Sequence, residues 1–395
     1  MRNSILHIIQ REFKRIGKSR PLVVLFTVIP IVVFTLICMV YSQELIYELP
    51  VAVLDEDHTE MSRTVTRYVD ASPTLNVVKS LESISQVESE IASGEFHAVF
   101  YIPKGTESEV KTGKQGHVGL YINSGNMLIG KLVYRNGLMA INTLSAGITI
   151  KQIEAAGKGE SFAKMMANPI PISSRSLYNG SYNYLQYLTP GMLTVLLQMI
   201  VMFAGCIAIN SEIKKETFGE LLKISNSNIL KIIVGKMVPY IVLSTVVIVL
   251  IVSVLFPIFS IKINGNLLNV YVLIELLVIA SLLLGFGLST LFKEIMAIDL
   301  AFVYNSPAFI FSGFTFPVMG MPWFDQVYAH LIPYTAFLDG FLKLYQMGLP
   351  FESAFKEMSI LLIFILAGFI VTAVGLMFRI KSYNKENLMS NMQIS

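Results

Sequence analysis

Charged residues are scarce in this chain. Asp, Glu, Lys and Arg together make up 14% of its 395 residues, whereas a soluble globular domain carries about 25%. Hydrophobic residues make up 54%, and the mean hydropathy is +0.62. There is too little polar surface to cover so apolar a chain in water. The composition therefore excludes an ordinary soluble protein and indicates a chain embedded in lipid.

Cysteine and histidine are also rare, and this limits the chemistry that the chain can perform. The two cysteines, Cys38 and Cys206, lie in different apolar runs, so no structural disulfide is expected. The five histidines lack a metal-ligand spacing such as HExxH. We therefore predict no catalytic residue and no metal site. The net charge of +3 is too small to indicate nucleic-acid binding.

Long apolar runs dominate what the chain does contain. A helix rises about 1.5 Å per residue, so about 20 apolar residues cross the core of a bilayer. Residues 22–41 meet this length without a charge and are predicted to form an uncleaved first span. Residues 190–378 are predicted to form a membrane domain of about five more spans, so the fold class is a membrane α-helical bundle. The runs behind these spans are 192–210, 238–259, 270–292, 298–316 and 358–378.

Lys and Arg residues set the expected orientation, because positive charges stay on the cytoplasmic side of a membrane. They precede the first span, separate the second from the third and follow the last, whereas the intervening loops hold few. Residues 1–21, predicted to be an amphipathic helix on the inner leaflet, and the tail of residues 379–395 are thus both expected in the cytoplasm. The expected location is the inner membrane of a bacterium.

Residues 42–189, between the first two spans, are polar enough to fold in water. Short apolar strands at 50–54, 76–78, 97–102 and 118–122 alternate with helical segments. Such alternation predicts an inserted α/β domain. The orientation places this domain outside the cytoplasm.

Two motifs in the insert invite a functional interpretation that the residues do not favour. Gly125 to Lys131 match GxxxxGK, but Leu132 follows where a phosphate-binding loop needs Ser or Thr to hold Mg²⁺. Asp55 and Asp57 form an acidic cluster after a strand, where a solvated turn is the simpler interpretation and Thr59 is a candidate helix cap. Both motifs are therefore interpreted as structural.

Three segments, in order along the chain, resemble the type-2 ABC exporter permeases, in the branch with a large external domain between the first two spans. In the insert, Leu49-Pro-Val-Ala-Val-Leu-Asp-Glu-Asp57 is followed by Ala92-Ser-Gly94 and Tyr101-Ile-Pro103. After the second span comes Glu212-Ile-Lys-Lys-Glu-Thr217, with Glu220-Leu-Leu222 and Gly235-Lys236. Before the last span stand Phe314-Thr-Phe-Pro317, Met321-Pro322 and Leu331-Ile-Pro333. The resemblance covers nearly the whole chain.

The resemblance implies that the chain is the permease subunit of an exporter powered by a separate ABC ATPase. The chain has no Walker A motif on its cytoplasmic side, so ATP and Mg²⁺ are expected in that ATPase and no cofactor here. Residues 211–231 have the pattern of an amphipathic helix that docks in a groove of the ATPase. An external hairpin, residues 317–350, is broken by Pro317, Pro322 and Pro333 and is expected to dip into the outer leaflet. The predicted coupling residues are Glu212, Glu216, Thr217, Phe218, Gly219, Leu221 and Leu222.

In this family one such chain encloses only half of a pathway, so a second permease, identical or related, is expected. Gln198 and Asn210 are polar residues of the second span and are predicted to face the interior. Glu275 either lines the path or reaches the lipid headgroups. The expected cargo is drug-like, lipid or otherwise amphipathic, and a periplasmic adaptor with an outer-membrane channel would complete the route. The alternatives are a gradient-driven transporter and an envelope sensor or assembly protein whose external domain binds a ligand.

Overall fold

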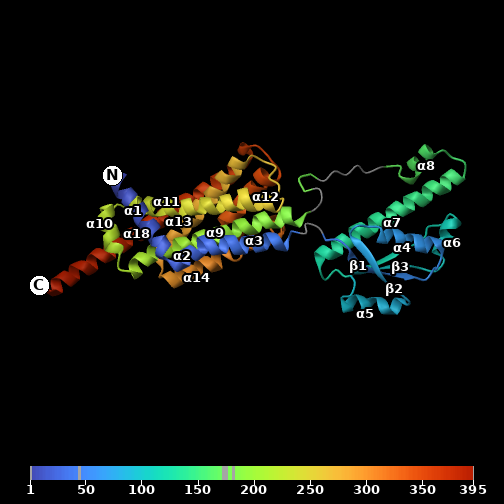
Figure 1. The fold of residues 1–395 in the computed structure, drawn as a ribbon, viewed down its shortest axis with the longest axis horizontal. Coiled ribbons are helices and arrows are strands. Elements are labelled where there is room, and N and C mark those ends of the chain that lie inside the picture. The colour runs from blue at the N-terminus through green and yellow to red at the C-terminus, as the bar shows by residue number, and fades with distance from the viewer. Residues whose placement is uncertain (1, 43–45, 171–176, 180–182, 395) are drawn as a thin grey trace. The chain divides into compact units, whose positions relative to one another are not determined.

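The computed structural model describes the chain except for residues 1, 43–45, 171–176, 180–182 and 395, and it leaves out the side chains of residues 2, 3 and 386–394. The described residues form two compact units (Figure 1). The membrane unit comprises Met1–Glu44 and Ser176–Ser395, and the α/β unit comprises Leu45–Arg175. Each unit has a hydrophobic core of its own.

The membrane unit contains 6 helices that are long and apolar enough to cross a membrane, counted over the described residues. This confirms the number of spans predicted from the sequence. The fifth span is interrupted at Pro307, which separates α14 (Glu294–Asn305) from α15 (Ala308–Phe311). The candidate spans are Arg20–Val40, Tyr184–Lys214, Ile229–Ile258, Leu267–Leu291, Glu294–Phe311 and Phe351–Lys385.

Helix α9 (Tyr184–Lys214) lies at the centre of the membrane unit. Its apolar segment is 78% buried, compared with 22% for the first span, which is made of α2 (Arg20–Val23), η1 (Val24–Val28) and α3 (Ile29–Val40). Helix α9 packs closely on α13 (Leu267–Leu291) through two glycines. A Cβ atom on Gly205 would lie 2.8 Å from the carbonyl oxygen of Leu282 and 3.0 Å from the Cα of Gly285. Small residues let the two backbones approach, as is usual between membrane helices.

The remaining helices of the membrane unit surround this pair. Helix α1 (Arg2–Lys18) precedes the first span and packs on α11 (Ile229–Val249). The third span continues from α11 through η3 (Leu250–Leu255) into α12 (Phe256–Ile258). The last span is α18 (Phe355–Ile394), which packs against α13. Within Figure 1 the long helices of this unit run side by side.

The predicted external hairpin is a series of short helices, one of which is buried in the membrane unit. These helices are η4 (Val318–Gly320), α16 (Trp323–His330), α17 (Pro333–Phe341) and η5 (Leu342–Gln346), and η6 (Phe351–Ala354) follows directly after the predicted hairpin. Pro333 opens α17, where a residue without an N–H group suits the first turn, and Pro317 and Pro322 directly precede η4 and α16.

A row of four aromatic rings runs along α17 and η5; α17 packs on α13 and α18, and η5 packs on α13. Neighbouring ring centroids of Tyr334, Phe337, Phe341 and Tyr345 lie 5.4, 5.2 and 4.9 Å apart. The Tyr334 hydroxyl donates to the carbonyl oxygen of Gly191 at 2.6 Å, which ties α17 to α9. The prolines of this segment therefore start helices instead of merely interrupting a loop. The depth of the segment in the outer leaflet stays a prediction.

The α/β unit contains a sheet of order β2-β1-β3-β4. Strand β1 (Leu49–Asp55) is parallel to β2 (Leu75–Leu81) and β3 (Ala98–Ile102), and β4 (Gly119–Ile122) is antiparallel to β3. Each segment predicted as a strand overlaps one of these strands. The remaining elements are α4 (Glu60–Asp70), η2 (Ile84–Gln86), α5 (Val87–Ser93), α6 (Thr106–Lys111), α7 (Met127–Ala155) and α8 (Glu160–Ala167).

Helices cover both faces of this sheet, because successive strand side chains point to opposite sides. Val51 and Val53 of β1 pack with α4 and α7, whereas Ala52 and Leu54 pack with α5. Helix α7 crosses the sheet closely at Gly137, where a Cβ atom would lie 2.9 Å from the ring of Phe100.

The acidic cluster and the glycine-rich turn of the α/β unit have structural roles. Asp55 Oδ1 accepts from the amides of Asp57 at 3.0 Å and His58 at 2.9 Å. The Asp57 carboxylate accepts from the amides of Gly105 at 2.6 Å and Glu107 at 2.9 Å, at the start of α6. In the glycine-rich turn, the Asn126 side chain caps the first amides of α7. Within the described residues no group of His, Cys, Asp and Glu is arranged to hold a metal ion.

We expect Asp57→Asn to destabilise the α/β unit by about 1 kcal/mol at neutral pH, because the carboxylate accepts the amides that begin α6. Partial burial alone would raise the pKa of Asp57, but hydrogen bonds from the amides of Glu107 and Gly105 outweigh burial and lower it. A carboxyl group with a lowered folded-state pKa contributes stability above its ordinary pKa of about 3.9, and this is lost as the pH falls through the folded-state value.

Hydrogen-exchange protection of amides 105–111 in the full-length protein measures this effect. The difference between the wild type and Asp57→Asn should be complete at neutral pH and should shrink below about pH 4. Glu88→Gln, at an exposed carboxyl of α5, should change protection at neither pH. A difference that persists unchanged in acid would contradict the assignment.

Candidate functional site: the coupling helix and its buried ion cluster

The segment between the second and third spans folds as a short amphipathic helix, α10 (Phe218–Ser225). Its apolar positions recur at helical spacing, so one face is buried while Glu220 and Lys223 on the other are exposed. Asn226 ends the helix in the left-handed conformation, with φ of 54°, which Asn tolerates better than most residues. The buried face consists of Phe218, Leu221, Leu222 and Ser225.

Helix α10 is fixed on several sides by the chain's own helices. It contacts α1, α9 and α11. The ring of Phe218 meets the ring of Tyr383 on α18 edge to face, with centroids 5.7 Å apart. At Gly219 any Cβ atom would collide with the hydroxyl of Tyr383. Helix α10 therefore cannot shift without moving the elements on which it packs.

Beside α10, three helices meet around ionised side chains that are withdrawn from solvent. Glu12 of α1 is 1% exposed, and Glu212 of α9 and Lys236 of α11 are each 0% exposed. The Lys236 Nζ lies 2.7 Å from Glu12 Oε2 and 2.9 Å from Glu212 Oε1. One lysine thus joins the carboxylates of two other helices. A buried charge is tolerated when it is paired in this way.

Two arginines of α1 complete this ion cluster, which we define as Arg11, Glu12, Arg15, Glu212, Glu220 and Lys236. Arg11 Nη1 lies 2.7 Å from Glu212 Oε1, and its Nη2 lies 3.0 Å from Glu220 Oε2 on α10. Arg15 pairs with Glu212 and lies 3.7 Å from Glu12. Burial would lower the pKa of Arg11, but Glu212 and Glu220 outweigh burial and raise it, so Arg11 stays charged.

Neutral groups also contact the carboxylates and the lysine of the ion cluster. The Thr217 hydroxyl donates to Glu212 Oε2 at 2.5 Å, and the Tyr240 hydroxyl donates to Glu12 Oε1 at 2.9 Å. Lys236 Nζ also donates to the carbonyl oxygen of Ala208 at 3.1 Å. With three cations and three carboxylates, the ion cluster is neutral overall. It joins α1, α9, α10 and α11 at one end of the membrane unit.

The structure shows which of the predicted coupling residues are exposed on this chain. Glu212, Phe218, Leu221 and Leu222 were predicted to contact an ATPase, yet their side chains are buried inside this chain. The helical pattern correctly predicts an amphipathic segment. Its apolar face packs on α1, α11 and α18 of this chain and is not exposed for another protein to bind. Thr217 and Gly219 are half-buried, and only Glu216 of the predicted set is exposed.

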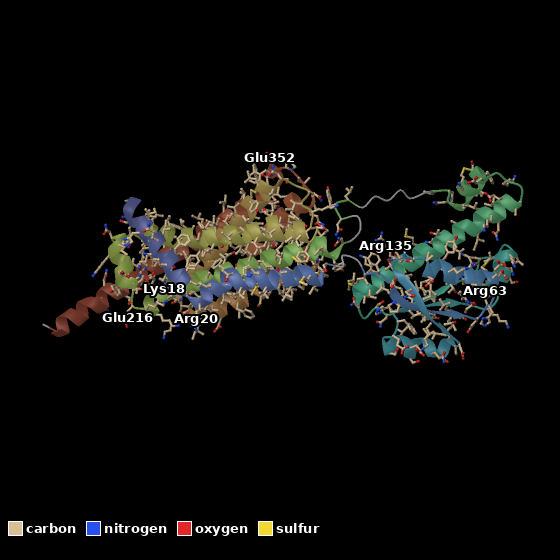
Figure 2. All side chains as sticks on the ribbon, in the orientation of Figure 1. Lys18, Arg20, Arg63, Arg135, Glu216 and Glu352 are labelled. Atoms are coloured by element: carbon tan, nitrogen blue, oxygen red, sulfur yellow. The ribbon has the colours of Figure 1, made fainter. Side chains whose placement is uncertain are left out.

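Figure 2 shows Glu216 near the end of the membrane unit where Lys18 and Arg20 lie, and Glu352 toward the opposite end. The side chains that the described part of the coupling segment, residues 211–231, leaves exposed are Ile213, Lys214, Lys215, Glu216, Glu220, Lys223, Asn226, Ser227, Asn228 and Leu230.

Sequence reasoning missed most of the ion cluster. Arg11 and Arg15 lie in the N-terminal segment predicted to be an amphipathic helix, with no partner predicted for either, and the pairing of Lys236 with Glu12 was not predicted. A signal was present, because Glu212 and Lys236 adjoin long apolar runs, where an ionised side chain needs a partner. The identity of that partner depends on packing between distant segments, since Arg11 and Glu212 are 201 residues apart.

The predicted pathway residues do not meet in one place. Gln198 of α9 is fully buried and donates to Asn305 Oδ1 of α14 at 2.5 Å. The backbone amide of Asn210 donates to Ser289 Oγ of α13 at 2.9 Å, and its side-chain amide donates to the carbonyl oxygen of Cys206 in α9 at 3.2 Å. Glu275 accepts from the Thr245 hydroxyl of α11 at 2.6 Å. The three side chains bond to α14, to α9 itself and to α11, and no hydrogen bond between described residues joins any two of them.

We expect Lys236→Met to destabilise the membrane unit by about 3–5 kcal/mol, because Glu12 and Glu212 lose their shared buried cation. Glu220→Gln should cost at most about 1 kcal/mol, since Glu220 is 63% exposed and exposed ion pairs contribute little. Thermal unfolding of the purified protein in one detergent compares the two variants. The double variant Glu12→Gln, Lys236→Met should recover part of the loss. Equal losses for Lys236→Met and Glu220→Gln would show that the ion cluster does not hold the helices together.

Comparisons with known proteins give consistent results. Residues 20–374 match the family model described as "ABC-2 family transporter protein". The probable multidrug ABC transporter permease YbhR of Escherichia coli K12 is 22% identical over 296 residues, which cover 73% of this chain and 75% of that protein. YbhR of Escherichia coli O157:H7 matches with the same identity and coverage.

Proposed function

Because this chain belongs to the ABC-2 family of transporter proteins, we propose that it exports a drug-like, lipid or other amphipathic substrate across the inner membrane of a bacterium. As an ABC-2 permease, it is the membrane subunit of a transporter and not itself an enzyme. The energy would come from ATP and Mg²⁺ held by a separate ATPase subunit. The name of the YbhR relative, a probable multidrug permease, supports the choice of substrate class.

The observation that carries this proposal is the attachment of α10 to the surrounding helices. An ATPase that docks on the exposed residues of segment 211–231 would push on a helix that is already bound to its neighbours. The Arg11–Glu220 pair would transmit the motion to α1, and the contact of Phe218 with Tyr383 would transmit it to α18. Glu212 and Lys236 would carry it to α9 and α11.

In this proposal the buried and exposed residues of the segment have separate tasks. Phe218, Leu221 and Leu222 hold α10 on the membrane unit, whereas Glu216 and Lys223 are free to meet a partner. Charges at the rim of an interface steer encounter and fix orientation. Helix α10 thus moves as one body with the helices it contacts. Its outer surface recognises the ATPase, and its inner surface is part of the membrane core.

A second permease, identical or related, would complete the pathway. Helix α14 leaves large apolar side chains uncovered, since Ile295 is 77%, Phe302 53% and Val303 64% exposed. Lipid or a second permease would cover this face. The Gln198–Asn305 contact lies between α9 and α14, so a substrate route that opens beside α14 would disturb it. The α/β unit, placed outside the cytoplasm, would meet a periplasmic adaptor and an outer-membrane channel.

The proposed orientation predicts opposite labelling at the two ends of the membrane unit. Glu216→Cys should react with a membrane-impermeant maleimide only after spheroplasts are permeabilised, because α10 is expected in the cytoplasm. Glu352→Cys and Arg63→Cys should react in intact spheroplasts. The native Cys38 and Cys206 are buried and should give little background. Labelling of Glu216→Cys from the outside would refute the orientation and the ATPase docking site together.

We expect the charge reversal Glu216→Lys to weaken association with the ATPase about tenfold, which corresponds to about 1.4 kcal/mol. Co-purification in mild detergent with the ABC ATPase expected to be encoded beside this gene, together with stimulation of its ATPase rate, measures the effect. Glu352→Lys is the matched control, since it reverses an exposed carboxylate toward the opposite end of the unit. Unchanged association and stimulation in Glu216→Lys, with the fold intact, would remove this surface from the coupling mechanism.

A further inference from the structure

A cavity of about 600 Å³ opens in the membrane unit where the ends of several spans meet. Lys214 at the end of α9, Glu294 at the start of α14 and Arg379 of α18 all line it. Ile213 and Arg379 also line an adjoining cavity beside Phe218 and Tyr383. The cavity therefore lies next to the coupling helix, but it contains none of the ion cluster.

The charges around this cavity do not balance. Three cations, Lys214, Lys293 and Arg379, face two carboxylates, Glu294 and Asp299, which leaves an excess of one positive charge. Lys214 Nζ lies 3.4 Å from Glu294 Oε2, so these two compensate each other. Lys293 and Arg379 remain, with Asp299 as the remaining carboxylate of the cavity wall, and together they account for the excess of one positive charge.

Neither of those two cations has a carboxylate partner among the described residues. The Arg379 guanidinium donates to the carbonyl oxygens of Thr290 at 2.8 Å and Phe292 at 3.5 Å, which are uncharged. The Lys293 ammonium group has no hydrogen-bond or ion-pair partner in the part of the chain that the structure describes. A single negative charge placed between Lys293 and Arg379 would thus be attracted to both.

The rest of the cavity wall is apolar and adjoins the start of a candidate span. Ile295 is 77% exposed and Met296 is 51% exposed, and both belong to the span Glu294–Phe311. Cations beside exposed apolar side chains at the end of a span are the arrangement that an amphiphile with an anionic head requires. A soluble anion would use the cations and leave the apolar wall uncovered.

We propose that this cavity binds an anionic phospholipid, with its phosphodiester between Lys293 and Arg379 and its acyl chains along Ile295 and Met296. A phosphodiester carries one negative charge, which matches the excess in the cavity. Asp299 accepts hydrogen bonds from the hydroxyls of a glycerol headgroup. The bound lipid joins α9, α14 and α18 beside the coupling helix. The proposed function places this end of the membrane unit in the cytoplasm, and on that basis the lipid belongs to the inner leaflet. The binding site itself does not depend on the proposed function.

Native mass spectrometry of the full-length protein in detergent tests the proposal by titration with phosphatidylglycerol, phosphatidylcholine or inorganic phosphate. Phosphatidylglycerol should bind more tightly than phosphatidylcholine. Lys293→Gln should weaken phosphatidylglycerol binding about fivefold, the effect of one cation near a membrane surface. The matched control Lys223→Gln removes an exposed cation of α10 that does not line the cavity and should leave binding unchanged. Ile295→Ser should weaken lipid binding.

Three outcomes would overturn the proposal. Equal binding of the two lipids would show that headgroup charge is not recognised. Equal losses in Lys293→Gln and Lys223→Gln would show attraction to general surface charge. Inorganic phosphate that displaces the lipid, together with unchanged lipid binding in Ile295→Ser, would show an anion site without lipid recognition. Association with the ATPase, measured on the same variants, should survive Lys293→Gln, so failure of this proposal is separable from failure of the proposed function.

Discussion

Charge that is buried at the end of a membrane bundle must be paired, and this requirement organises the structure. Glu12, Glu212 and Lys236 are almost completely withdrawn from solvent, and each would be costly to bury alone. Their pairing brings α1, α9 and α11 together, and Arg11 extends the contact to α10. Removing either sign would leave the other uncompensated, so these helices depend on one another more strongly than apolar contact alone would require.

This constraint explains why the coupling segment is a rigid part of the membrane unit. An amphipathic helix outside a membrane can lay its apolar face on a partner or on its own chain, and α10 does the second. Its inner face meets Tyr383 of α18 and its edge meets Arg11 of α1. Only the polar outer face of α10 is exposed for a partner to contact. Through these contacts α10 is joined directly to several helices of the membrane unit.

The opposite end of the membrane unit uses a different device. There the aromatic rings of α17 and η5 stack along the segment, and its tyrosine hydroxyl groups donate to backbone carbonyls of α9. A tyrosine ring can stack on its neighbours while its hydroxyl group donates a hydrogen bond, which suits a segment that is buried among spans yet contains short irregular turns. One end of the bundle is thus fixed by paired charge and the other by aromatic packing, while α9 and α13 approach closely between them at Gly205 and Gly285.

The sequence by itself determined the number of spans, the two-unit organisation and the amphipathic character of α10, because apolar length, strand alternation and helical spacing are local properties of the chain. It also indicated that the acidic cluster at Asp55 and Asp57 serves a turn. Only the tertiary structure decided that Phe218, Leu221 and Leu222 face inward, that Pro333 opens a buried helix and that Lys236 joins Glu12 to Glu212. The physical reason is that burial and ion pairing are set by contacts between helices that lie far apart in the chain, such as Glu12 and Lys236, which are 224 residues apart.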